Sequence, residues 1–355
     1  MNKYSPFLKF KNGEITALSK LSPNEKKMII PLLELPRDSR YNEDELINTI
    51  ANQAKKFKKY IETSFVFYID NYEISDDIKI NGEDNYKYLL DSFSEYNLIP
   101  IIGLDRTDEH NNIAIDFANK ISAKIGIRIT QEYFASFPAY NEDFKNLFTQ
   151  INHGVSCDIL LDCNYIDDSN IHIMERHISN IIKDMFKIYQ FENIVISGSS
   201  IPMSKNIGSI VKTNTNVRIP RNEVNLFRNL KNKFSKITFT FGDYTVISPG
   251  YSEIDIDPKK IHLIMTSKII YSELDSHYFT RGNKLWQYGF EQYFSQAEDI
   301  INQPFFRGEN YSCGDKFLYD KATFGGTNIT PATIIAPEVN AHITFMINEI
   351  TKGSI

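Results

Sequence analysis

The chain has 355 residues, 42% of them hydrophobic and 24% charged, and its formal net charge is −6 at pH 7. This length suits one α/β barrel with about a hundred additional residues, and the acidic balance excludes a globally basic, nucleic-acid-binding surface. Its three cysteines form no disulfide framework or CxxC pair, and the sequence lacks a signal-peptide core and any apolar run of about 18 residues, which predicts a cytoplasmic protein with no membrane partner.

Eight strand-like apolar runs recur along the chain, and nearly every run ends in a polar or charged residue. In chain order they are Tyr4–Lys9, Ile29–Glu34, Phe65–Asp70, Ile99–Asp105, Ile125–Arg128, Ile159–Asp162, Ile194–Ser199 and Ile237–Asp243. Helix-like segments lie between them, at Glu14–Leu21, Asn42–Ala51, Tyr86–Tyr96, Asn112–Ser122, Glu142–Asn152, Ile171–Tyr189 and Asn222–Phe234. This alternation predicts an α/β fold of the (β/α)8 TIM-barrel type.

The pattern changes after Asp243. A strand, an amphipathic helix, a segment of loop or short strands, and a final helix are predicted at Ile261–Tyr271, Trp286–Asn302, Tyr311–Thr330 and Pro337–Lys352. We therefore predict barrel strands and most barrel helices within 1–245, an α+β extension over 246–330, and a helix that closes the barrel within 331–355. The aromatic content of the extension is too high for a solvated linker, so we expect it to pack on the barrel.

The residues that end the runs are the candidate site. Because residues two apart in a strand share a face, these side chains should meet at the carboxyl end of the barrel. The candidate catalytic and metal-binding acids are Glu34, Asp70 and Asp162, and the candidate ligand-binding residues are Lys9, Lys11, Asp105, Arg128 and Ser199. Such a ring could hold Mg²⁺ or Mn²⁺ through its acids, bind phosphate through its cations, or neutralise itself through ion pairs. The sequence leaves open whether Gly242 or Asp243 faces inward.

Short motifs at both ends of the chain resemble one known family. They are Tyr4-Ser-Pro-Phe-Leu-Lys-Phe-Lys-Asn-Gly-Glu-Ile-Thr-Ala-Leu, Ile30-Pro-Leu-Leu-Glu-Leu-Pro36, Arg281-Gly282, Tyr311-Ser-Cys-Gly-Asp315 and Asn340-Ala-His342. They resemble the beta protein, or beta family protein, first named from phage. The resemblance implies a barrel-like fold and a bacterial or phage setting close to antiviral defence genes, with no established reaction. It marks Lys9, Lys11, Glu14, Glu34, Arg281, Asp315, Asn340 and His342 as positions of interest.

Two functional hypotheses remain open at this level. In the first, the mouth binds a phosphate-bearing ligand, either a nucleotide or nucleic acid, with or without metal-dependent phosphodiester chemistry. In the second, the chain is a non-catalytic component of a defence complex, and its extension docks a partner protein encoded nearby. The aromatic residues of the extension suit either a partner interface or a buried contact with the barrel; they are Tyr278, Trp286, Tyr288, Phe290, Tyr293 and Phe294. Nucleophile-elbow, zincin and P-loop motifs are missing, so the sequence does not decide whether the chain is an enzyme.

Overall fold

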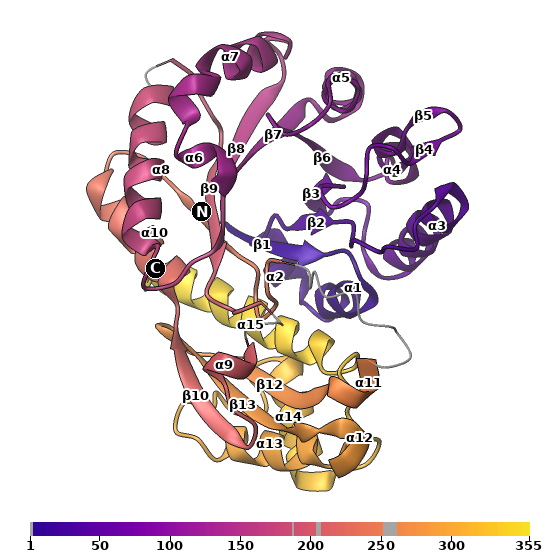
Figure 1. Cartoon of the computed structure of the whole chain (residues 1–355), viewed down its shortest axis with the longest axis vertical. Helices are drawn as coiled ribbons and strands as arrows, with labels where there is room; N and C mark the ends of the chain where they lie inside the picture. Colours follow the sequence, from indigo (N-terminus) through magenta and orange to yellow (C-terminus); the bar gives the residue numbers. More distant parts are fainter. Residues whose placement is uncertain (1–2, 187, 204–206, 251–260) are drawn as a thin grey trace.

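The computed structural model describes residues 3–186, 188–203, 207–250 and 261–355. The predicted apolar runs form eight parallel strands that close into a barrel, which confirms the (β/α)8 prediction (Figure 1). Around the barrel the strands are β1 (Tyr4–Lys9), β2 (Leu32–Glu34), β3 (Val66–Asp70), β6 (Asn97–Ile102), β7 (Lys124–Thr130), β8 (Ser156–Tyr165), β9 (Ile194–Ser199) and β11 (Thr240–Asp243). A short hairpin, β4 (Lys79–Ile80) and β5 (Glu83–Asp84), lies outside the barrel after β3.

Helices cover the outside of the barrel. They are α1 (Asn12–Ser19), α2 (Pro23–Lys27), α3 (Glu43–Tyr60), α4 (Asn85–Ser92), α5 (Asp108–Phe117), the π-helix η1 (Ala118–Ser122), α6 (Gln131–Phe134), the 3-10 helix η2 (Phe137–Tyr140), α7 (Asn141–Thr149), α8 (Ile171–Met185) and α10 (Asn222–Lys233). The start of α3 shows why the chain turns helical there: Asn42 accepts a hydrogen bond from the Glu45 N–H at 2.9 Å, and acidic residues fill the first turn. No helix in the described part of the chain is long and apolar enough to cross a membrane.

The barrel interior is filled with side chains and is not an open pore. Phe7, Leu32, Tyr68 and Leu160 belong to one buried apolar cluster inside the strands. A larger cluster fills the layer between the strands and the helices. Because side chains alternate along each strand, the residue two positions after each interior apolar residue also faces inward, at the carboxyl end of the barrel. The fold therefore aims the strand-end charges at one mouth.

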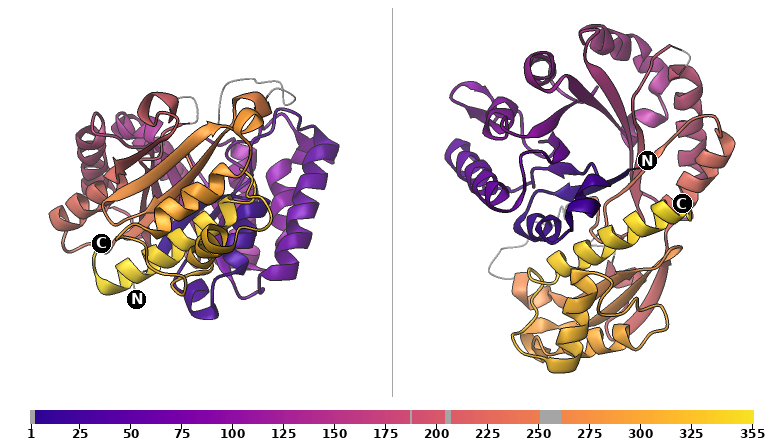
Figure 2. Two further views of the ribbon diagram at one scale, coloured as in Figure 1. Left: turned by 90° about the horizontal axis from the view of Figure 1, so that it is seen from below. Right: turned by 180° about the vertical axis from the view of Figure 1, so that it is seen from behind.

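The extension is an ordered unit with its own sheet and core. Its elements are α9 (Ile207–Ile210), β10 (Thr215–Pro220), α11 (Ile261–Ile264), β12 (Thr266–Ser272), β13 (Ser276–Lys284), α12 (Leu285–Tyr288), α13 (Gln292–Ile301) and α14 (Cys313–Phe324). The antiparallel sheet has the order β10-β13-β12, and a second hydrophobic cluster lies beneath it. The last helix, α15 (Ile335–Lys352), packs on β1 and α1 of the barrel and on β12 and α14 of the extension (Figures 1 and 2).

The structure corrects four predictions for this region. The segment Tyr311–Thr330 contains helix α14, which begins after Ser312, whose side chain accepts a hydrogen bond from the Asp315 N–H at 3.0 Å. The sheet includes β10, which comes from inside the range assigned to the barrel. The helix predicted over Trp286–Asn302 is broken at Gly289, where φ is +77°. The strand predicted from Ile261 begins only after the short helix α11.

A buried polar network joins the barrel to the extension, and we call it the clasp. Its members are Arg221, Glu223, Asp243, Ser272, His277 and His342, each 3% exposed or less. Arg221 donates to Glu223 at 2.7 Å and to Asp243 at 2.8 Å, and His342 Nε2 donates to Asp243 at 2.9 Å. The Ser272 hydroxyl lies 2.6 Å from His342 Nδ1 and 3.0 Å from His277 Nδ1. The question left by the sequence is thereby answered: Asp243 faces outward, into the clasp.

The Asp243, His342 and Ser272 side chains have the hydrogen-bond order of a hydrolase triad. Burial rules out that role for the structure described here, because no substrate can reach a hydroxyl that is covered on all sides by the extension and α15. Burial lowers the pKa of His277 to about 4. Burial opposes ionisation of Asp243, but His342 and Arg221 outweigh it and hold the pKa of Asp243 well below its usual range. The clasp therefore holds a charged Asp243 carboxylate between the buried Arg221 guanidinium and a hydrogen bond from His342.

We expect Arg221→Met to lower the free energy of unfolding by about 3–5 kcal/mol, because it leaves Glu223 and Asp243 buried without their cation. Urea unfolding followed by circular dichroism measures the loss. The control is Arg40→Met, because Arg40 pairs with Asp38 on the surface and its side chain is 74% exposed. Equal stabilities for the two variants would contradict a clasp that holds the extension.

Candidate functional site

The strand-end side chains converge at the mouth, as the two-residue periodicity predicts. Lys9 is the register partner of Glu34, and Glu34 is the partner of Asp70 on the next strand. Arg128 projects from β7 across the barrel and contacts Glu34 and Asp70 at 2.7 Å each. On its own side Arg128 contacts Asp162 of β8 at 2.6 Å. Four predicted site residues are therefore joined in one ion-pair network, with Lys9 beside it.

The Arg128 guanidinium is fully committed to this network. It makes five hydrogen bonds, two to Asp162 and one each to Glu34, Asp70 and the hydroxyl of Tyr244. A guanidinium has five N–H donors, so none remains for a ligand. The structure therefore does not support the prediction that Arg128 binds phosphate. Its visible role is to neutralise acids that would be costly to bury alone.

The Arg128 network includes residues that the sequence reasoning missed. Arg106 donates from one nitrogen, Nη2, to both carboxylate oxygens of Asp70, at 2.9 Å each. The Tyr72 ring lies 4.6 Å from the Arg106 guanidinium and 4.7 Å from that of Arg128. Tyr244 donates to Asp162 at 2.7 Å. Arg106 could have been found from the sequence, because it directly follows the predicted strand-end residue Asp105. Tyr244 could not, because the sequence left open which residues of β11 face the barrel interior.

The predicted metal ligands do not fit a metal ion. Among the described residues, no group of three or more His, Cys, Asp or Glu side chains is arranged to hold one. Glu34, Asp70 and Asp162 instead share a guanidinium, which occupies the place that a cation would take. Burial raises the pKa of Glu34. For Asp70 burial acts in the same direction, but Arg106 and Arg128 outweigh it and lower the pKa.

A pocket of about 540 Å³ opens beside this network, where β1 ends and α1 begins. Lys9, Lys11 and Glu14 all line it, and they are three of the positions marked by the family resemblance. Lys9 Nζ donates to the carbonyl of Gly250 at 3.3 Å. The opposite wall includes Ile335 at the start of α15. The pocket therefore lies between the barrel mouth and α15, the helix that contributes His342 to the clasp.

The pKa values of two ionisable groups in this pocket are shifted toward neutral pH. Burial lowers the pKa of Lys9 to about 8, although Glu34 acts in the opposite direction. Burial also raises the pKa of Glu14 to about 7, against the effects of its own backbone N–H and of Lys11. Both groups change charge near physiological pH, which is common in binding and catalytic sites. Asn12, Gly13 and Glu14 of the first turn of α1 also line this pocket, and Lys11 provides no side-chain cap for the helix.

A second pocket of about 530 Å³ lies on the other side of the mouth, over the loops after β2, β3 and β6. Asp105 and Arg106 line it together with Arg37 and Glu73. Asp105 accepts a hydrogen bond from Thr130 at 3.4 Å, and Arg106 lies 3.7 Å away. Burial raises the pKa of Glu73. Cations and anions alternate here, so this pocket has no clear preference for an anion.

The other predicted site residues lie outside both pockets. Ser199 accepts a hydrogen bond from the Ile201 N–H at 3.1 Å and shapes the turn after β9. Arg281 of β13 donates to Thr266 at 3.1 Å within the extension. Asp315 accepts from the Tyr271 hydroxyl, and His342 belongs to the clasp. Asn340 accepts from the Gly314 N–H at 3.0 Å. The four C-terminal motif positions thus make structural contacts of the extension and α15.

We expect Arg128→Met to lower the free energy of unfolding by about 3–5 kcal/mol, because three acids then lie at the mouth without the cation they share. Acid should restore part of this loss, since without the arginine the buried acids bind protons more readily than in the unfolded chain. Urea unfolding at several pH values tests both points. Arg176→Met, at an exposed arginine of α8, is the control. A stable Arg128 variant with no altered pH dependence would contradict the neutralising role.

The comparison with protein families agrees with the motifs at both ends of the chain. No curated protein matches the sequence. The family model described as Beta protein matches residues 4–348, which include the whole barrel, the clasp and nearly all of α15. The chain therefore belongs to the Beta protein family.

Proposed function

We propose that the barrel mouth binds a phosphate-bearing ligand in the pocket at the end of β1, and that the chain does so as a component of antiviral defence. The observation that carries the first part is the meeting of Lys9, Lys11 and Glu14 in one cavity beside the first turn of α1. The defence setting rests on the family resemblance. The ligand class covers a free nucleotide and nucleic acid, which share the phosphate group.

The pocket offers the two features that phosphate binding uses. Lysine ammonium groups act as point charges for phosphate oxygens, and the first-turn N–H groups of a helix supply donors and a favourable dipole. The first turn can lie close to α15 because position 13 is glycine: a Cβ there would be 2.9 Å from Ile335 Cγ2. Among the described residues that line this pocket Glu14 is the one acid, and it becomes neutral when protonated. An anion would favour that protonated form.

The Arg128 network serves the pocket as a rigid floor in this proposal. It fixes Glu34 beside Lys9, and Glu34 acts to raise the pKa of that lysine. The metal-dependent phosphodiester chemistry predicted from the sequence has no support among the described residues, so the proposal is binding without a stated reaction. Phosphate chemistry would need a further group that the described residues do not supply.

The alternative, a protein-docking extension, is favoured by one observation. Leu263 and Ile264 of α11 and Trp286 and Tyr288 of α12 are between 39% and 55% exposed, and the two helices contact each other. Most other aromatic residues of the extension pack into its core, including Tyr278 and Tyr293. The docking hypothesis therefore reduces to this small apolar patch. In this alternative, a partner protein encoded near the gene would bind at that patch.

We expect the double variant Lys9→Ala/Lys11→Ala to fold and to bind phosphate-bearing probes at least about tenfold more weakly, a loss of 1.4 kcal/mol or more. Isothermal titration with inorganic phosphate, AMP and a short single-stranded oligonucleotide measures the change, with and without Mg²⁺. Lys55→Ala, at an exposed lysine of α3, is the control. Undiminished binding of every probe would contradict the proposed site. Protection against phage by the same variants tests the defence role.

Anion binding in this pocket should weaken as the pH rises. Deprotonation of Glu14 near pH 7 adds a negative charge, and deprotonation of Lys9 near pH 8 removes a positive one. Sulfate is the suitable probe because its own charge is constant between about pH 6 and pH 9. Glu14→Gln should remove the step near pH 7 and keep the step near pH 8. The control Glu298→Gln, at an exposed glutamate of α13, should keep both steps, and a flat profile in the unmodified protein would refute the assignment.

A further inference from the structure

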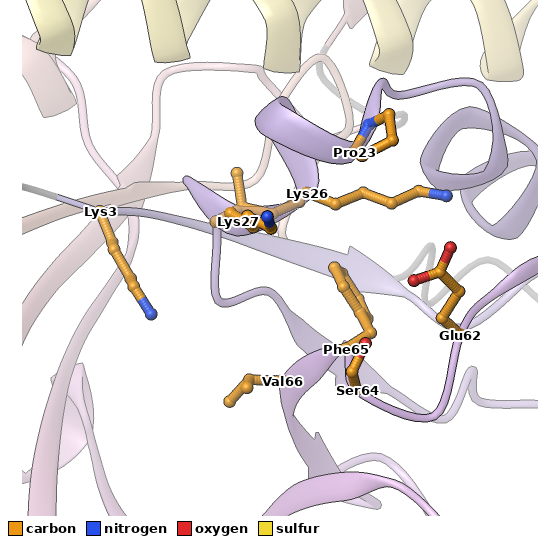
Figure 3. Close-up of a pocket in the computed structure, with 9 residues that line it drawn as sticks. Lys3, Pro23, Lys26, Lys27, Glu62, Ser64, Phe65 and Val66 are labelled. Atoms are coloured by element: carbon orange, nitrogen blue, oxygen red, sulfur yellow. The ribbon is translucent and has the colours of Figure 1, made fainter.

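A separate pocket lies at the opposite end of the barrel from the mouth, and Figure 3 shows it in close-up. Lys3 comes from the residue before β1, Lys26 and Lys27 from the end of α2, and Phe65 and Val66 from the start of β3. These positions are at the amino ends of strands, whereas Lys9 and Asp70 mark the carboxyl ends. The volume is about 310 Å³. None of the site residues predicted from the sequence lines this pocket.

The charge of the pocket is unbalanced. Three lysines line it against one carboxylate, Glu62, although the whole chain carries a net charge of −6. Among the described residues, no ion pair within 4.0 Å is found for Lys3, Lys26 or Lys27. In Figure 3 Lys3 and Lys26 lie on opposite sides of the cavity, and Lys26 extends toward Glu62. Like charges drawn from separate elements repel each other, and an anion between them would relieve that repulsion.

An ordinary explanation exists for two of these lysines. Lys26 and Lys27 occupy the last turn of α2, where cations complement the helix dipole. The helix has only five residues, so its dipole is small, and it does not account for Lys3, which precedes a strand. The dipole also does not explain why the three lysines surround a cavity. Three lysines from two separate segments line one cavity, and a solvated helix end lacks this feature.

The walls of the pocket indicate what accompanies the negative charge. Ile29 is 2% exposed and Phe65 is 6% exposed, and together they form an apolar floor. Ser64 adds a hydroxyl group at the rim. A cavity of this volume is at the small end of the range for ligand sites, so it fits one phosphate group with a compact organic body. Lysines suit phosphate as point charges that do not demand a fixed orientation.

We propose that this cavity is a second anion site, which takes a small phosphate-bearing organic molecule of the size of a mononucleotide, on the barrel face opposite the mouth. The phosphate lies on the side of the cavity lined by Lys3 and Lys27, Lys26 adds positive charge from the opposite side, and the organic body packs on Ile29 and Phe65. The site is independent of the Lys9 pocket, because it shares no residue with it. Failure of one site therefore leaves the other unaffected.

Isothermal titration of the full chain with AMP and with inorganic phosphate tests the proposal. Lys26→Ala/Lys27→Ala should weaken a binding component for AMP by at least about tenfold. Lys9→Ala/Lys11→Ala should leave that component unchanged, and it thereby separates this site from the mouth. Lys183→Ala/Lys236→Ala removes two exposed lysines elsewhere and should also leave it unchanged. Equal binding by the Lys26/Lys27 variant and this control would overturn the proposal, as would the absence of AMP binding by the unmodified chain.

A filling variant tests the organic part of the ligand. Ser64 is exposed at the rim, so Ser64→Phe should keep the fold and occupy the cavity. It should weaken AMP binding several-fold more than phosphate binding, because phosphate does not need the apolar floor. An equal effect on both ligands would overturn the organic-body assignment. If a short oligonucleotide binds more tightly than AMP through the same lysines, the small-molecule assignment is wrong and the ligand is a nucleic acid.

Discussion

The acids at the barrel mouth depend on one cation, Arg128. Glu34, Asp70 and Asp162 are fixed by the period of three different strands, and in a closed barrel they cannot turn away from one another. A guanidinium that spans the barrel is what allows these acids to remain buried. The same contacts use every donor of the arginine, so ligand binding at the mouth has to use other cations. Our proposal therefore assigns this role to the lysines at the end of β1.

The sequence was sufficient for the barrel because each strand is short, apolar and bounded by a polar residue. The same period, which can be read from the sequence alone, predicts that Glu34, Asp70, Arg128 and Asp162 lie at one mouth. It could not say which charges neutralise which, because Arg128 reaches Glu34 from 94 positions away in the chain. Local sequence patterns carry no information about a contact between residues so far apart in the chain. The metal-ligand hypothesis failed at this step, since the arginine and a metal ion suit the same three acids.

Outside the barrel the sequence signals were weaker for physical reasons. β10 alternates between exposed and half-buried residues, so its composition does not resemble a buried strand, and it pairs with a strand about sixty residues later. Asp243 ends an apolar run just as Asp70 does, yet it faces outward because β11 presents Gly242 and Tyr244 to the interior. A shift of one position along a strand moves a side chain to the other face of the barrel, and this decides whether an acid lies at the mouth or in the clasp. Period-two reasoning fails when both faces of a strand are buried.

The family positions divide into two groups that meet at α15. Lys9, Lys11 and Glu14 line the pocket, and Ile335 at the start of α15 forms part of the same pocket. His342, two turns further along this helix, is bonded into the clasp with Asp243 and Ser272. A rigid helix transmits the position fixed by the clasp to the wall of the pocket. In the proposed function the extension therefore helps to shape the pocket, so residues far from the mouth affect the same pocket as Lys9.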